Sequence, residues 1–168
     1  NKKYLPGQFI AHFIWPHHYR MLQFFREEVI GFIEKEVESF YEVGVGCGMY
    51  SLEILKKLKN VSGIGIDISD HSLDFTSKVI QAHELEDRYN IKNIDINKNN
   101  LESPADLVVS QEVLEHLEDP QGFLKSLNQS TKNLKWCFVT AAINAGHTDH
   151  IYLYRSPSDV EKQINECN

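Results

Sequence analysis

A glycine-rich segment that directly follows an apolar run constrains the fold of this chain more than any other feature. The apolar run ends at Glu42. Glycine then occupies every second position of a short segment, here called the glycine turn: Gly44, Gly46 and Gly48. Apolar residues next recur at helical spacing over residues 52–58. Strand, glycine turn and helix in this order are typical of nucleotide-binding α/β folds, because glycine lets a ligand approach the backbone and the helix N-terminus offers free N–H groups.

Three further segments favour the same fold. A second apolar run, residues 61–66, ends at Asp67, nineteen positions after the last glycine of the turn. An acid at this distance can accept hydrogen bonds from both hydroxyls of a ribose. A third run ends near Asp95, and a fourth, residues 105–110, leads into the segment QEVLEHLEDP at residues 111–120.

Together these segments resemble the class I S-adenosylmethionine-dependent methyltransferases. The E-x-G-x-G-x-G turn, the acid after the second strand and the D-L-V-V-S-x-E-V-L-E-H-L-x-D-P segment stand in that family's order, over about residues 38–140. The last segment resembles a small-molecule methyltransferase subgroup. The resemblance implies a doubly wound, Rossmann-like α/β fold with a mainly parallel sheet and helices on both faces. It also implies transfer of a methyl group from S-adenosylmethionine to an oxygen or nitrogen of a small-molecule acceptor by in-line displacement.

The resemblance assigns most of the cofactor site. Glu42 and the glycine turn would contact the methionine end of S-adenosylmethionine, although Gly48 also suits close packing of helix on strand. Asp67 would bind the ribose hydroxyls, and Ile68 would pack on the adenine. Tyr19, near the start of an N-terminal helix over the mouth of the site, is a further candidate for cofactor contact.

Two other pairs of residues complete the assignment. Asp95 and Ile96 stand where the family holds the adenine amino group, unless Asn97 fills that place or Asp95 is only a turn residue. Ser110 and Gln111, at the tip of the fourth strand, would line the cleft beside the reactive methyl group.

Alternating patterns predict five parallel strands joined by helices in right-handed crossovers. We expect strands at residues 36–45, 61–67, 89–96, 107–110 and 136–142, and helices at residues 17–33, 49–60 and 69–83, from residue 120 and after residue 156. Pro6 and Pro16 argue against one continuous helix over residues 1–16. The resembled family has seven strands, and this sequence ends after the helix that follows the fifth. We therefore expect the C-terminal strands to be missing or truncated.

The chain is expected to form two parts. Residues 1–35 are an N-terminal helical cap segment, and residues 36–168 are the S-adenosylmethionine-binding methyltransferase domain. His18 in the cap segment is a candidate for substrate contact. Glu112 is a second one, on a helix that we expect to begin there and to carry Glu112 and Glu115 on one face.

Histidines supply the candidate catalytic groups, because imidazole has a pKa suited to a general base. His147 and His150 lie in the loop after the fifth strand, at the ligand-binding end of the sheet, and Asp149 could orient either ring. His116 is a third candidate. A metal site formed by the loop histidines with His17 or His18 is the rival chemistry, and an exposed loop is the alternative to both; we predict no metal.

Composition limits the function classes. The net charge is −7, with 17 basic and 24 acidic side chains, which disfavours a broad nucleic-acid surface. We find no leader sequence and no apolar run near the ~18 residues of a membrane span. The three cysteines lack metal-site spacing, so we expect reduced thiols and a cytoplasmic protein, with a homodimer left open.

Two other functions remain open. A nicotinamide (NAD)-dependent oxidoreductase would need glycine or alanine at the sixth position of the turn, where Met49 stands. A non-catalytic S-adenosylmethionine-binding module would keep the fold and lack the reaction.

Overall fold

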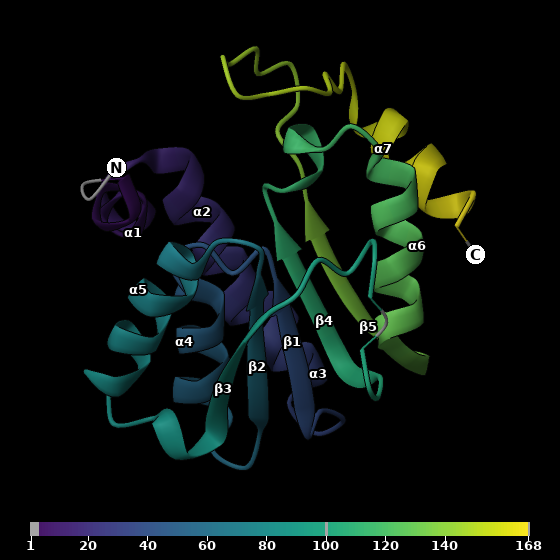
Figure 1. The fold of residues 1–168 in the computed structure, drawn as a ribbon. Coiled ribbons are helices and arrows are strands. Elements are labelled where there is room, and N and C mark those ends of the chain that lie inside the picture. Colours follow the sequence, from purple (N-terminus) through teal and green to yellow (C-terminus); the bar gives the residue numbers. More distant parts are fainter. Residues whose placement is uncertain (1–3, 100, 168) are drawn as a thin grey trace.

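One parallel sheet forms the centre of the computed structural model, which describes residues 4–99 and 101–167 (Figure 1). The strands lie in the order β3-β2-β1-β4-β5, and every pairing is parallel. Their bounds are Ser39–Val43 for β1, Ser62–Asp67 for β2, Tyr89–Asn93 for β3, Ala105–Gln111 for β4 and Thr131–Thr140 for β5. The chain builds outward from β1 on one side and then returns to its other side with β4. The ends of β1 and β4 therefore form the switch point at which ligands bind in such sheets.

The predicted fold class is confirmed, while several strand ends differ from the sequence prediction. β3 ends at Asn93, three residues early, and β5 begins at Thr131, five residues early. The early start of β5 was missed because residues 132–135 form no apolar run. The pairing with β4 also shifts register between Ala105 and Leu107, which a sequence pattern does not show.

Helices from the N-terminal half cover one face of the sheet. They are α2 (Pro16–Phe24), a π-helical turn η1 (Phe25–Val29), α3 (Ile30–Ile33), α4 (Met49–Lys57) and α5 (Asp70–Gln81), while α1 (Tyr4–Ile14) packs on α2 near the C-terminal ends of the strands. The sequence did not predict α1. Pro6 falls in its first turn, where the missing N–H would have no helical partner in any case, so it does not prevent the helix. Pro16 starts α2 instead of interrupting α1.

The other face carries α6 (Pro120–Ser130) and α7 (Pro157–Asn165). Both helices begin at a capped turn: Asp119 Oδ1 accepts from the Gly122 N–H at 2.9 Å, and Asp159 Oδ2 accepts from the Ser156 N–H at 3.0 Å. The short 3₁₀ turns are η2 (Glu86–Arg88) and η3 (Leu114–His116).

The expectation that a helix begins at Glu112 is wrong. Glu112 has a φ of 51°, in the left-handed region, and only the three-residue turn η3 follows it. Glu112 and Glu115 therefore do not share a helix face. A positive φ at a non-glycine residue has no simple sequence signature, which explains the error.

Apolar side chains fill both faces of the sheet, as expected for central parallel strands. The core under α2 and α4 includes Phe25, Tyr50 and Leu107. The core under α6 includes Val108 and Leu124. None of the helices in the described ranges is long and apolar enough to cross a membrane.

Two segments lie over the C-terminal ends of the strands. In Figure 1, α1 and α2 stand to one side of these ends, and the yellow-green loop that follows β5 stands over β4. This loop is closed at its base, because Ile143 pairs with Tyr154 and the Asn144 N–H donates to the Tyr154 carbonyl at 2.8 Å. A hollow of about 720 Å³ lies elsewhere, beside β5, and Phe32 and Trp136 are among the residues that line it.

Candidate cofactor and acceptor site

The glycine turn has the conformation that its residues predict. Gly44, Gly46 and Gly48 have φ values of 72°, 51° and 71°, which other residues rarely adopt. A Cβ at Gly44 would lie 2.5 Å from Val113, and one at Gly48 would lie 2.6 Å from Thr76. A Cβ at Gly46 would meet only the side-chain amide of Gln8, at 3.2 Å, and its own turn. Packing therefore requires two of the glycines, while Gly46 faces the space under α1.

Glu42 lies beneath this turn and ties β1 to α4. Its side chain is 3% exposed, and Oε2 accepts from the Ser51 N–H in the first turn of α4 at 2.7 Å. Burial raises the pKa of Glu42 to about 7, although the hydrogen bonds from Ser51 oppose this shift. Cys47 beside it is also buried, and burial raises the pKa of its thiol to about 12, so it is no nucleophile at neutral pH.

Asp67 lies at the tip of β2, as predicted, and binds the turn directly. Oδ2 accepts from the Gly46 N–H at 3.1 Å, and Oδ1 accepts from the Ser69 N–H at 2.9 Å. Ionised carboxylate oxygens can accept further bonds, so both remain able to bind hydroxyls. Ile68 is 72% exposed, which leaves an apolar surface beside the acid.

The tip of β3 differs from the prediction. Asp95 lies in a turn, where it accepts from the Asn97 N–H at 3.1 Å and pairs with Lys98 at 2.8 Å. Ile96 is 6% exposed and belongs to the core on the α6 face. The residue paired with Asp67 on the neighbouring strand is Asn93. The sequence did not predict Asn93 at the tip because β3 was expected to be longer.

The tip of β4 presents two predicted residues to opposite faces, as the period of a strand requires. Gln111 lies on the α4 side, where its Nε2 donates to the Tyr50 hydroxyl at 2.5 Å. Ser110 is 1% exposed, and its hydroxyl has no partner among the described residues. Glu112 is held at the end of β5, because Oε1 accepts from Thr140 Oγ1 at 3.0 Å.

The N-terminal helices bring polar side chains over the glycine turn. These side chains were not predicted from the sequence. His12 is 3% exposed; Nδ1 bonds to the Gln8 carbonyl at 2.9 Å, and Nε2 has no partner among the described residues. Burial lowers the pKa of His12 and keeps the ring neutral. Gln8 and His12 are four residues apart and therefore lie on one face of a helix. A prediction of α1 would have indicated this shared polar face.

The predicted contact residues of α2 differ in their accessibility. His18 is half-buried, and burial lowers its pKa while the charge of Glu112 opposes the shift, so the two face the same region. Tyr19 is 42% exposed, and its hydroxyl accepts from Gln23 at 2.7 Å. His18 thus faces the site more directly than Tyr19 does.

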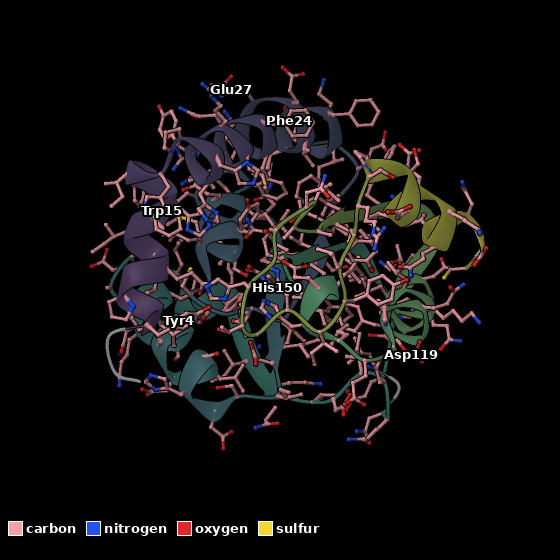
Figure 2. The ribbon with its side chains drawn as sticks, turned by 90° about the horizontal axis from the view of Figure 1, so that it is seen from above. Tyr4, Trp15, Phe24, Glu27, Asp119 and His150 are labelled. Carbon is pink, nitrogen blue, oxygen red and sulfur yellow. The ribbon has the colours of Figure 1, made fainter. Side chains whose placement is uncertain are left out.

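The structure gathers all three candidate catalytic histidines. His147 Nδ1 bonds to the Asp149 carboxylate, and the rings of His116 and His150 lie 4.9 Å apart and nearly perpendicular. Figure 2 shows His150 near the middle of the molecule, over the ends of the strands, with Tyr4 and Trp15 toward one rim. Ligand atoms of Glu115, His116 and His150 lie within 4.8 Å of one another, as do those of His147, Asp149 and His150. Neither group includes His17 or His18.

Comparison with known proteins identifies the family. A family described as a methyltransferase domain matches residues 41–133, more than half of the chain, and the chain therefore belongs to it. A curated relative, the ubiquinone biosynthesis O-methyltransferase of Nitrosomonas europaea, is 30% identical over 135 residues, which are 78% of this chain and 53% of the relative. The chain thus spans about half the length of the curated relatives it matches.

Solved structures show the same fold at low identity. A putative sarcosine dimethylglycine methyltransferase from Galdieria sulphuraria has a TM-score of 0.73 at 15% identity, over 89% of this chain and 60% of that one. The [4+2]-cyclase SpnF has a TM-score of 0.69 at 13% identity, over 83% and 56%. Because the fold also occurs in a cyclase, the fold alone does not define the reaction.

The buried Glu42 generates a pH-dependent prediction. The pKa of Glu42 is about 7 in the folded chain and near 4.5 in the unfolded chain. Between pH 4.5 and pH 7 the folded chain therefore keeps a proton on Glu42 that the unfolded chain has released. Stability therefore falls as pH rises from 4.5 to 7. Glu42→Gln keeps an oxygen for Ser51, so its free energy of unfolding should exceed wild type by about 3 kcal/mol at pH 8 and match it near pH 4.

Urea denaturation at the two pH values measures this difference. The exposed Glu86 in η2 supplies the control, and Glu86→Gln should show no pH-dependent difference from wild type. A Glu42→Gln variant that is less stable than wild type at pH 8 would contradict the assignment.

Proposed function

We propose that this chain binds S-adenosylmethionine and transfers its methyl group to an oxygen of a small-molecule acceptor. The observation that carries the proposal is the glycine turn, held between Glu42 and Asp67 at the switch point of a methyltransferase-family chain. The curated relative is named as an O-methyltransferase, which favours oxygen over nitrogen. The chain's net charge of −7 favours a small acceptor over nucleic acid.

The cofactor would lie along the strand tips. Asp67 would bind the ribose hydroxyls, and the exposed Ile68 would pack on the adenine ring. Asp95 would reach the adenine amino group from its turn, with Asn93 as the nearer alternative on the neighbouring strand. The methionine end would lie beside Gly46, next to the side-chain amide of Gln8.

The methionine end of S-adenosylmethionine would also lie near polar atoms of α1 that lack a hydrogen-bond partner among the described residues. The buried side-chain oxygen of Gln8 beside Gly46 has no partner among the described residues. A buried acceptor without a donor is unfavourable, and the ammonium group of S-adenosylmethionine would supply one. Glu42 would act from below, by holding α4 and the turn in place.

The acceptor would enter between the N-terminal helices and the loop after β5. The pKa of Tyr4 is raised by burial and then by the charge of Asp149, which supports close approach of α1 and this loop. His18 and Glu112 would contact the acceptor here. Gln111 would border the reactive methyl group from the α4 side, and Ser110 would line the tip of β4 from the opposite face.

The reaction requires alignment and the removal of one proton. The acceptor oxygen forms a bond to the methyl carbon while the carbon–sulfur bond breaks, and its electrons remain on sulfur as a neutral thioether. The hydroxyl proton would pass to Nε2 of His147, because Asp149 holds the other ring nitrogen as a donor. His116 and His150 are the alternative bases.

Two properties belong to the same proposal. The three free cysteines fit a reducing compartment such as the cytoplasm. A homodimer remains open, and sedimentation would identify it.

Replacing Asp67 with alanine should weaken S-adenosylmethionine binding at least 10²-fold, because two charge-assisted hydrogen bonds of roughly 1.5–3 kcal/mol each are lost. Calorimetric titration measures the affinity. Asp87→Ala, at an exposed position of η2, is the matched control and should bind normally. Unchanged affinity in a folded Asp67→Ala variant would rule out the ribose assignment.

Replacing His147 with alanine should lower turnover by ~10²–10⁴ while cofactor affinity stays near wild type, because only proton removal is affected. The measurement uses methyl-labelled S-adenosylmethionine and a panel of phenolic acceptors. His83→Ala, at the exposed end of α5, is the control. Turnover of the His147→Ala variant within a few-fold of wild type would exclude His147 as the base. If the wild-type chain binds the cofactor but turns over none of the acceptors, a non-catalytic module would be favoured.

A further inference from the structure

A buried carboxylate with one unpaired oxygen lies beside the histidine loop. Glu115 in η3 is 1% exposed, and its Oε2 has no hydrogen-bond partner among the described residues. Its backbone carbonyl accepts from the N–H groups of Ile151 at 2.8 Å and Tyr152 at 2.9 Å, so the loop is fixed against η3. Because a buried carboxylate oxygen is unfavourable without a donor or a cation, this position calls for a ligand.

Two imidazole rings beside Glu115 are held in the tautomer that binds metals. His116 Nδ1 donates to the Asp149 carbonyl at 2.8 Å, and His150 Nδ1 donates to the Ala145 carbonyl at 2.7 Å. A carbonyl oxygen can only accept, so each Nδ1 carries a hydrogen, and in the neutral ring Nε2 is the nitrogen with the free lone pair. Metal-binding histidines almost always donate their second ring nitrogen in this way.

From this geometry we propose that Glu115, His116 and His150 bind one divalent transition-metal cation of the zinc type. One ligand atom from each residue lies within 4.8 Å of the others. Two imidazoles and one carboxylate suit Zn²⁺ or Co²⁺, whereas Mg²⁺ and Ca²⁺ prefer oxygen ligands alone. Three protein ligands leave a coordination position open for water or substrate.

The neighbouring group of His147, Asp149 and His150 is less suited to the ion. Its first two members are exposed and already paired with each other. Glu115 supplies the buried, unpaired oxygen that this second group lacks. The sequence analysis predicted no metal site, because Glu115 and His150 are 35 positions apart and meet only when the loop folds back on η3.

The site lies at the same end of the sheet as the glycine turn, since η3 follows β4 and the loop follows β5. Its role in the reaction rests on the proposed function. An acceptor hydroxyl on the open position would lose its proton more readily, because a bound cation lowers the pKa of its oxygen ligands. That proton would pass to His147, while the cation holds the oxygen for attack on the methyl carbon.

Metal binding tests the site without any methyl acceptor. The full chain is treated with a chelator, dialysed and titrated with Co²⁺ and Zn²⁺, with absorption spectroscopy and calorimetry as readouts. We expect one ion per chain and visible cobalt bands of a low-coordinate site. Glu115→Gln and His150→Ala should each weaken binding at least 10-fold, whereas His147→Ala and His83→Ala should bind as wild type does.

Each outcome is decisive for the site. His150 is on a surface loop, so His150→Ala tests the site even where Glu115→Gln disturbs the fold. Wild-type affinity in His150→Ala, or no stoichiometric binding to wild type, would overturn the proposal. Equal loss in His147→Ala would overturn the ligand assignment in favour of the exposed group. Because S-adenosylmethionine affinity is measured separately, failure of the metal site and failure of the proposed function are distinguishable.

Discussion

The attachment of the glycine turn to the end of β2 is the interaction on which the site depends. The Ile66 carbonyl accepts from the N–H groups of Gly44 at 2.8 Å and Val45 at 3.1 Å, and the Asp67 carboxylate accepts from the next donor, Gly46. These bonds fix the turn across the tips of two adjacent strands. Glu42 then fixes α4 behind the turn. The position of a ligand bound at this turn would thus be set by the fixed backbone, and only a few side chains would need to recognise it.

The second half of the site depends on a different constraint. The loop after β5 is closed by the bridge between Ile143 and Tyr154 and is pinned to the Glu115 carbonyl. This brings His147 and His150 to His116, which lies more than 30 positions earlier in the chain. A turn fixed by backbone hydrogen bonds beside a site built from a loop fits a fold that hosts many different functions.

The strand, glycine turn and helix, with the acid at the tip of the next strand, could be predicted from sequence because their signals are local. Glycine at every second position, an acid after the next apolar run and a helical pattern each report on a few neighbouring residues. The positive φ of Glu112, the burial of Ile96 and the partners of the three histidines depend on distant segments, so no local pattern contains them. The helix α1 was missed for another reason, because a proline in a first turn looks like a helix breaker when the helix start is unknown.

The central claim is that the glycine turn is the cofactor site. Amide hydrogen exchange, measured with and without S-adenosylhomocysteine, tests it most directly, because a ligand bound over the turn and the start of α4 would oppose the local opening that exchange requires. The account predicts slower exchange over residues 44–51 and 67–69. Unchanged exchange there, with protection instead beside the hollow that Phe32 and Trp136 line, would contradict it.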